Sequence, residues 1–143
     1  MADSQKFAVA AHALAYLAHR EATAAESAVS SVELAASIQT HPVVIRRVTG
    51  LLAQAGLVAT RAGARGGAWL IQDPADIKLD TVLKAVDAGP HIGVTTKGAS
   101  GCPVGEKLPS AVCAIIRSAD AAAAERLSTI TVADLLASAA ALP

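Results

Sequence analysis

The 143-residue chain is poor in aromatic residues, with one Trp, one Tyr and one Phe, and it holds only two cysteines. A core of Ala, Val, Leu and Ile buries little area per side chain, which favours a subunit that pairs with a copy of itself. Two cysteines exclude a disulfide-rich secreted scaffold. The chain has no run of ~20 apolar residues and no recognisable leader, so we expect a soluble, cytoplasmic protein without a membrane partner.

Acidic residues are absent from one part of the chain, although the formal net charge is zero. Residues 41–72 carry four arginines and no Asp or Glu. A phosphate backbone responds to local charge, so this segment is the candidate nucleic-acid surface. The sequence also lacks a nucleophile elbow and a phosphate-binding loop, so we do not expect an enzyme.

Hydrophobic spacing predicts a mainly α-helical fold with one small β-hairpin. A capping box, Ser30-x-x-Glu33, starts a second helix, Pro42 suits the first turn of a third, and Gly56 suits its end. The pattern indicates a winged helix-turn-helix in residues 1–76, followed in 77–143 by a linker helix, a sensor loop and dimerisation helices. The expected helices are 6–20, 30–38, 42–54, 77–86, 108–127 and 132–139; the expected strands are 57–61 and 68–72; and a glycine-rich loop covers 88–107.

The third helix is the candidate DNA reader, and its apolar stripe is expected at Val44, Val48, Leu51, Leu52 and Ala55. Reading helices present their N-terminal residues to base edges in the major groove, which selects His41, Val43 and Arg46. Arg46 could pair with guanine, worth roughly 1–3 kcal/mol of discrimination, and Val43 could touch a thymine methyl. Arg47 lies at the margin of the apolar stripe. The alternative is that both arginines only solvate an exposed helix face.

Ser31 and Thr40 are expected to contact phosphates or to cap helices. In the hairpin, Arg61 and Arg65 flank a glycine turn, and either could enter a narrow minor groove. The alternative is an ordinary glycine hairpin with two solvated charges. Trp69 is expected to pack rather than to stack on a base.

The ordered set of motifs covers nearly the whole chain. They are Phe7-Ala-Val-Ala-Ala-His12, Ser31-x-x-Leu34-Ala35, His41-Pro-Val-Val-x-Arg46-Arg47, Leu51-x-x-x-Ala-Gly56-Leu57-Val58, Gly63-x-x-Gly66-Gly67-x-x-Leu70, Ile77-x-Leu79-x-x-Val82, Cys102-Pro-Val-Gly105 and Thr129-Ile-Thr-Val-Ala-Asp134-Leu135. In this order they resemble the Rrf-two family of bacterial winged-helix regulators, including its YwnA-like branch. The resemblance implies a homodimer formed through the long fifth helix, a palindromic DNA operator, and a transcription regulator that is usually a repressor.

The resemblance also raises the question of a [2Fe–2S] cluster, because many relatives hold one with three cysteines. This chain has only Cys102 and Cys113, so we expect no cofactor. One hypothesis is a redox switch, in which Cys102 is oxidised or forms a bridge with Cys113 within or between subunits. The alternative is that Cys113, one turn into the dimer helix, is a small hydrophobe and Cys102 an incidental thiol.

The four histidines show no ligand spacing, and His12 is more simply a packed or hydrogen-bonded residue, so we expect no metal site. Two other functions stay open at this point. The first is a winged-helix protein-interaction module that does not bind DNA. The second is an iron–sulfur regulator with atypical ligands.

Overall fold

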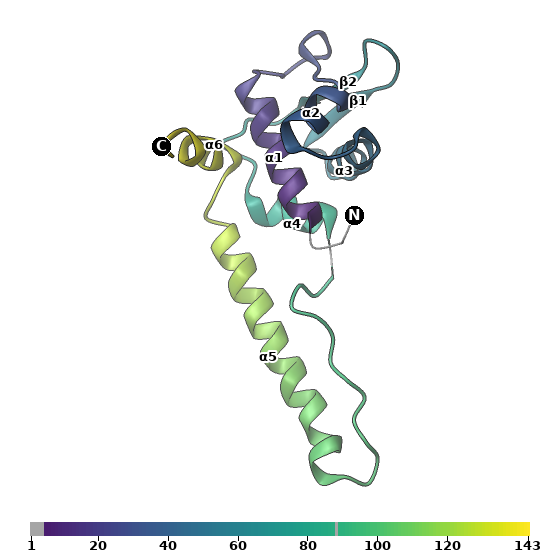
Figure 1. Ribbon diagram of the computed structural model, residues 1–143. Coiled ribbons are helices and arrows are strands. Elements are labelled where there is room, and N and C mark those ends of the chain that lie inside the picture. The colour runs from purple at the N-terminus through teal and green to yellow at the C-terminus, as the bar shows by residue number, and fades with distance from the viewer. Residues whose placement is uncertain (1–4, 88) are drawn as a thin grey trace.

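The computed structural model describes residues 5–87 and 89–143. In these residues five of the six α-helices, one 3₁₀ turn and two strands form a head, and the remaining helix, which is long, projects from it (Figure 1). This confirms the expected fold class, mainly α with a small hairpin. The elements are α1 (Lys6–His19), η2 (Ala25–Ser27), α2 (Ser31–Ile38), α3 (Pro42–Gln54), β1 (Val58–Arg61), β2 (Gly67–Leu70), α4 (Leu79–Val86), α5 (Pro103–Leu127) and α6 (Val132–Ala140).

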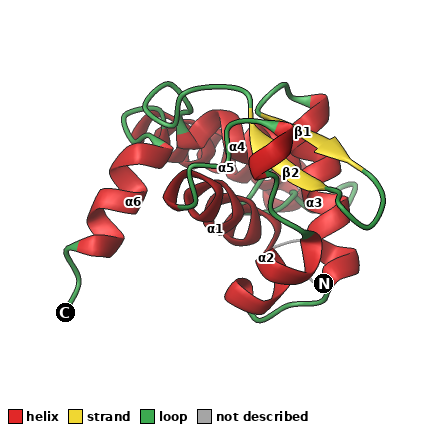
Figure 2. Ribbon diagram, turned by 90° about the horizontal axis from the view of Figure 1, so that it is seen from above, coloured by secondary structure: helices red, strands yellow, loops and turns green. Residues whose placement is uncertain are grey.

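The head has a single core with α1 running through it, and α6 and the hairpin lie on opposite sides of α1 (Figure 2). Leu14 and Leu17 of α1 are fully buried against the other helices. The same core includes Val82 of α4 and Val132 of α6. The division expected at residue 76 therefore does not separate two cores, because α4 completes the head.

Ser30 caps α2, as the sequence predicts, by accepting a hydrogen bond from the Glu33 backbone N–H at 3.1 Å. The other half of the expected capping box is not formed. The Glu33 carboxylate instead accepts the Tyr16 hydroxyl at 2.9 Å and pairs with Arg20. Glu33 therefore ties α2 to α1 and fixes the helix-turn-helix on the core.

The hairpin is antiparallel, with Val58 opposite Leu70 and Arg61 opposite Gly67, and each strand lies within one or two residues of its expected range. A third short segment supports it, because Val29 and Ala68 exchange two backbone hydrogen bonds of 2.9 Å. Gly67 is required here, since a Cβ would stand 2.3 Å from the Val29 carbonyl oxygen. The wing is thus anchored at its base to the segment that leads into α2.

The long helix corrects the sequence prediction, which placed residues 103–107 in a loop. α5 begins at Pro103, five residues before the expected start. Proline fits the first helical position, where its missing N–H would have no partner. Pro109 lies inside the helix, and its carbonyl accepts the Thr95 hydroxyl at 3.0 Å, so the loop before α5 runs back along it (Figure 1).

None of the residues of α5 is buried within one chain. No helix in the described part of the chain is long and apolar enough to cross a membrane.

Candidate nucleic-acid interface

α3 packs on the head through Ile45, Val48, Thr49 and Leu52, all of which are buried. The apolar stripe that the sequence predicted for α3 is displaced by about one residue around the helix from the side that is buried. It omitted Ile45 and included Ala55, which is exposed. The side that carries Arg46 and Arg47 is exposed, as the sequence predicts.

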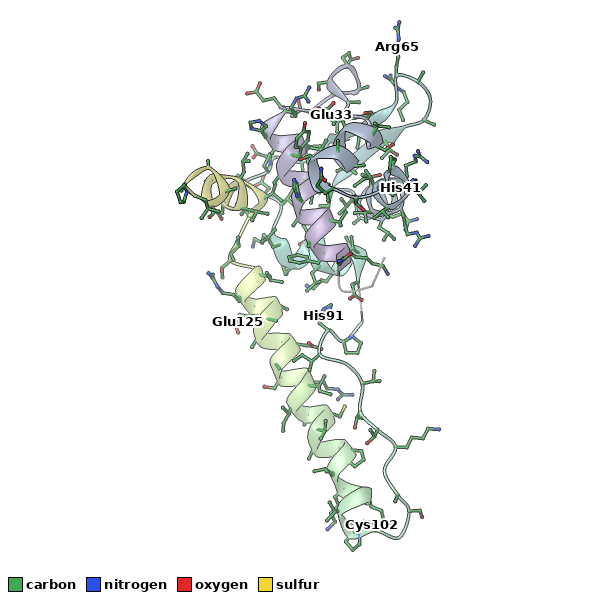
Figure 3. All side chains as sticks on the ribbon, in the orientation of Figure 1. Glu33, His41, Arg65, His91, Cys102 and Glu125 are labelled. Atoms are coloured by element: carbon green, nitrogen blue, oxygen red, sulfur yellow. The ribbon has the colours of Figure 1, made fainter. Side chains whose placement is uncertain are left out.

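His41 determines where α3 begins, a role that the sequence analysis did not assign. Its Nδ1 accepts the Val43 backbone N–H at 3.2 Å, and Pro42 fills the first helical position. In the neutral ring this bond assigns the proton to Nε2, which is left to donate outward. Val43, 49 % exposed, lies next to it. His41 and Val43 therefore stand together at the N-terminal end of α3, with His41 labelled in Figure 3.

Arg46 contacts α2 as well as solvent. Its Nε donates to the Ser31 hydroxyl at 3.4 Å, and its two terminal nitrogens have no partner in the described part of the chain. Ser31 is thus the first residue of α2 and a neighbour of Arg46, while Ser30 is the cap. Thr40 lies in the turn between the helices, where its backbone N–H bonds to the Ala35 carbonyl at 3.0 Å.

The two wing arginines, which the sequence could not distinguish, have different positions. The Arg61 Nη2 donates to the Arg65 carbonyl at 2.9 Å and lies 3.5 Å from the Ala25 carbonyl oxygen. Arg61 therefore braces the wing. Arg65 points outward from the wing tip, and its guanidinium has no partner within residues 5–87 and 89–143 (Figure 3).

The wing turn between β1 and β2 leaves no room for side chains at its closing end. A Cβ on Gly66 would lie 2.1 Å from the Arg61 carbonyl oxygen, and Gly63 has a φ of +100°. Trp69 is partly buried and packs against the core, as expected. Between Glu33 and Asp73 the sequence holds no acidic residue, so all the formal charges on α3 and the wing are positive.

The two cysteines lie on α5, away from this surface. Cys102 is exposed at the far end of the helix, where its Sγ accepts the Gly105 backbone N–H at 3.3 Å (Figure 3). Because α5 starts early, Cys113 lies about three turns into it, not one, and is about 16 Å along the helix from Cys102. A disulfide needs Cα atoms closer than about 7 Å. The hypothesis of a Cys102–Cys113 bridge within one chain is therefore wrong for this structure.

Comparison with known proteins agrees with this geometry. The profile of the Rrf2 family, described as an iron-dependent transcriptional regulator, matches residues 3–138. The Bacillus subtilis protein YwnA, named as an HTH-type transcriptional regulator, is 32 % identical over 134 residues, which cover 93 % of this chain and 96 % of YwnA.

Two solved structures resemble the whole chain. One is a transcriptional regulator from Lactobacillus plantarum, with a TM-score of 0.79, 27 % identity and coverage of 96 % of this chain and 91 % of that one. The other, IscR of T. potens, has a TM-score of 0.67, 22 % identity and coverage of 96 % and 89 %, and at that identity it shows the fold alone.

The family description implies iron, and the donor groups of one chain do not fit an iron–sulfur site. Three cysteines cannot come from a chain with two. No group of three His, Cys, Asp or Glu side chains in the described residues could hold a metal ion. His12 is hydrogen-bonded to the Ser37 hydroxyl at 3.1 Å, which suits a structural histidine. We therefore derive no function through iron.

Proposed function

The chain belongs to the Rrf2 family of transcriptional regulators, and from this premise we propose that it is a homodimeric, sequence-specific DNA-binding repressor. One observation carries the proposal. The exposed side of α3 and the wing tip present Arg46, Arg47 and Arg65, which lie in a segment, residues 34–72, that has no acidic residue. Such a surface has the charge that a phosphate backbone requires.

The docking follows from the geometry of the two elements. The N-terminal end of α3 enters the major groove, where His41 Nε2–H, Val43 and Arg46 meet base edges. Arg65 enters the adjacent minor groove, while Arg61 holds the wing in place. Arg47, Ser31 and Thr40 lie beside these readers and contact the phosphates.

The homodimer is supported by the uncovered apolar side chains of α5. Leu108 and Ile115 are 54 % and 69 % exposed, and Val112 lies on the same side of the helix. Nothing in residues 5–87 and 89–143 of the same chain covers these side chains, whereas a second copy of α5 offers the same apolar surface. A two-fold dimer presents two reading helices in opposite directions, and we therefore expect a palindromic operator.

The test is selection of duplexes from a random pool, followed by binding measurements at several salt concentrations. We expect an inverted repeat to be enriched, and log Kobs to fall steeply with log[salt]. Sedimentation should show one dimer on each duplex, and a reporter promoter carrying the repeat should be silenced. A protein that enriches no sequence and binds without salt dependence would instead be a protein-interaction module.

A redox input through Cys102 is a second part of this proposal. Its sulfur is exposed and accepts the Gly105 backbone N–H at the start of α5, so peroxide can reach it and oxidise it to a sulfenic acid with release of water. We expect peroxide to release wild-type protein and the Cys113→Ser variant from DNA, while Cys102→Ser stays bound. Equal release of all three proteins would remove Cys102 as the sensor.

A further inference from the structure

A groove of about 540 Å³ lies between α2, α3 and the hairpin, beside the residues proposed to read DNA. Its apolar lining includes Val29, Leu34 and Ile45, which belong to the core of the head. Small-ligand sites in proteins span roughly 300–1,000 Å³. The groove is therefore large enough for a small organic molecule.

The charges along this groove have one sign. Arg46 and Arg61 are the only charged residues among the described residues that line it, and Ser31 and Thr60 add hydroxyl groups. Both guanidinium groups keep unused N–H donors, because Arg46 uses only Nε and Arg61 only Nη2 in the hydrogen bonds of the head. An apolar lining under two cations suits a ligand with an apolar body and an anionic group.

Gly50 is a second, independent indication that the space is available. It lies inside α3 and lines the groove, and a Cβ built on it would have no atom within 4 Å. A glycine inside a helix costs about 1 kcal/mol relative to alanine. No contact with the described part of the chain requires glycine at this position, so the open side of α3 is left free for something outside the chain.

We propose that this groove binds a compact organic anion, an apolar body with one carboxylate, and that the bound anion releases DNA. The inference rests on the proposed function, because it names a regulatory ligand for the DNA-reading surface. The anion pairs with Arg46, which then cannot reach guanine. The apolar body of the anion fills the space between α3 and the wing. In the proposed complex, the DNA strand that separates the major groove from the minor groove passes through this same space.

The test is an NMR titration of the whole protein without DNA. The probes are benzoate and phenylacetate, each compared with its neutral amide. Two variants replace the helical glycine. The small side chain of Gly50→Ala leaves the groove open, whereas the larger side chain of Gly50→Leu fills part of it. Ala36→Leu, on the exposed side of α2 and outside the groove, is the matched control.

We expect the carboxylates, and not the amides, to shift the resonances of Gly50, Arg46 and the wing. Gly50→Leu should raise the Kd by about tenfold or more, because its side chain takes the ligand's space, while Ala36→Leu should match the wild type. If Gly50→Leu does not fold, Arg46→Gln gives the same test, since it removes the cation and should abolish the response.

Three results would overturn the inference: no response to either carboxylate, equal responses to the amides, or unchanged binding in Gly50→Leu and Arg46→Gln. Weaker DNA binding in Gly50→Leu without any response to carboxylates would also overturn it, and would assign the groove to the DNA strand itself. DNA binding is measured separately on the same variants without the anion. A failure of the proposed function is therefore distinguished from a failure of the ligand site.

Discussion

Arg46→Gln should change which base the protein prefers while leaving the fold intact. The Arg46 side chain is exposed, and its hydrogen bond to Ser31 is long, at 3.4 Å. We therefore expect the free energy of unfolding to change by less than about 0.5 kcal/mol. Arginine pairs with guanine and glutamine with adenine, so one position in each half-site should shift from guanine towards adenine.

The size of the effect follows from one lost bidentate pair in each half-site. Such a pair is worth about 1–3 kcal/mol, which is about 5- to 150-fold in Kd for a single half-site. The assay is binding of wild type and variant to the selected operator and to duplexes with each base substituted, at several salt concentrations. Arg47→Gln is the matched control. Because Arg47 is proposed to contact a phosphate, this variant should weaken binding to all duplexes equally and reduce the salt slope by about 1 for each half-site.

Two results would refute this reasoning. If Arg46→Gln weakens every duplex by the same factor and lowers the salt slope as Arg47→Gln does, Arg46 contacts phosphate, and α3 is docked differently. If neither variant changes binding, the basic face of α3 does not meet DNA.

Three further predictions concern the wing, the dimer and the C-terminal helix. Gly66→Ala should open the wing turn, because its Cβ would meet the Arg61 carbonyl oxygen, and thermal unfolding should show a loss of about 1–3 kcal/mol together with weaker operator binding. Ile115→Glu should raise the dimer dissociation constant about a hundredfold or more in sedimentation, and its circular dichroism should be unchanged because α5 is not buried within one chain. The Thr131 backbone N–H and then its hydroxyl lower the pKa of Asp134, so the stabilisation exists above the ordinary aspartate pKa of about 3.9 and is lost as the pH falls through the lowered value. Asp134→Asn should therefore unfold at a lower temperature than wild type at pH 7, and the difference should shrink as the pH falls below the ordinary aspartate pKa.

The sequence predicted the helix-turn-helix closely because its signals are local. Ser30, Pro42 and Gly56 each act on the backbone next to them, and α2 and α3 begin or end where those residues indicate. The start of α5 was missed because the glycine-rich segment 88–107 was taken as a loop along its whole length. Pro103 occupies the first helical position, and the glycines that precede it do not extend the loop past that residue.

The candidate site was identified by residue type and not by role. Nothing in the local sequence distinguishes Arg61 from Arg65, since the difference depends on carbonyl groups that the folded turn and η2 bring to Arg61. The pairing of Arg46 with Ser31 likewise depends on how α2 crosses α3. Gly50 carried a signal that could have been used, because a glycine on the polar side of a helix has no stabilising role.

The two proposed regulatory signals, the bound anion and the oxidation of Cys102, act on different parts of the protein. The first acts within one head and the second on the pairing of two chains, and one variant distinguishes them. The groove lies wholly within one head, so a compact anion should bind equally well whether or not α5 is paired. Cys102 lies at the far end of α5, and no residue of that helix is buried in one chain, so we expect oxidation there to act on the heads by changing how two copies pair. A monomeric Ile115→Glu protein should therefore keep its NMR response to benzoate, while its weak binding to a single half-site should no longer respond to peroxide. If peroxide still released that monomer, the oxidised group would have to act inside the head, and neither cysteine is there.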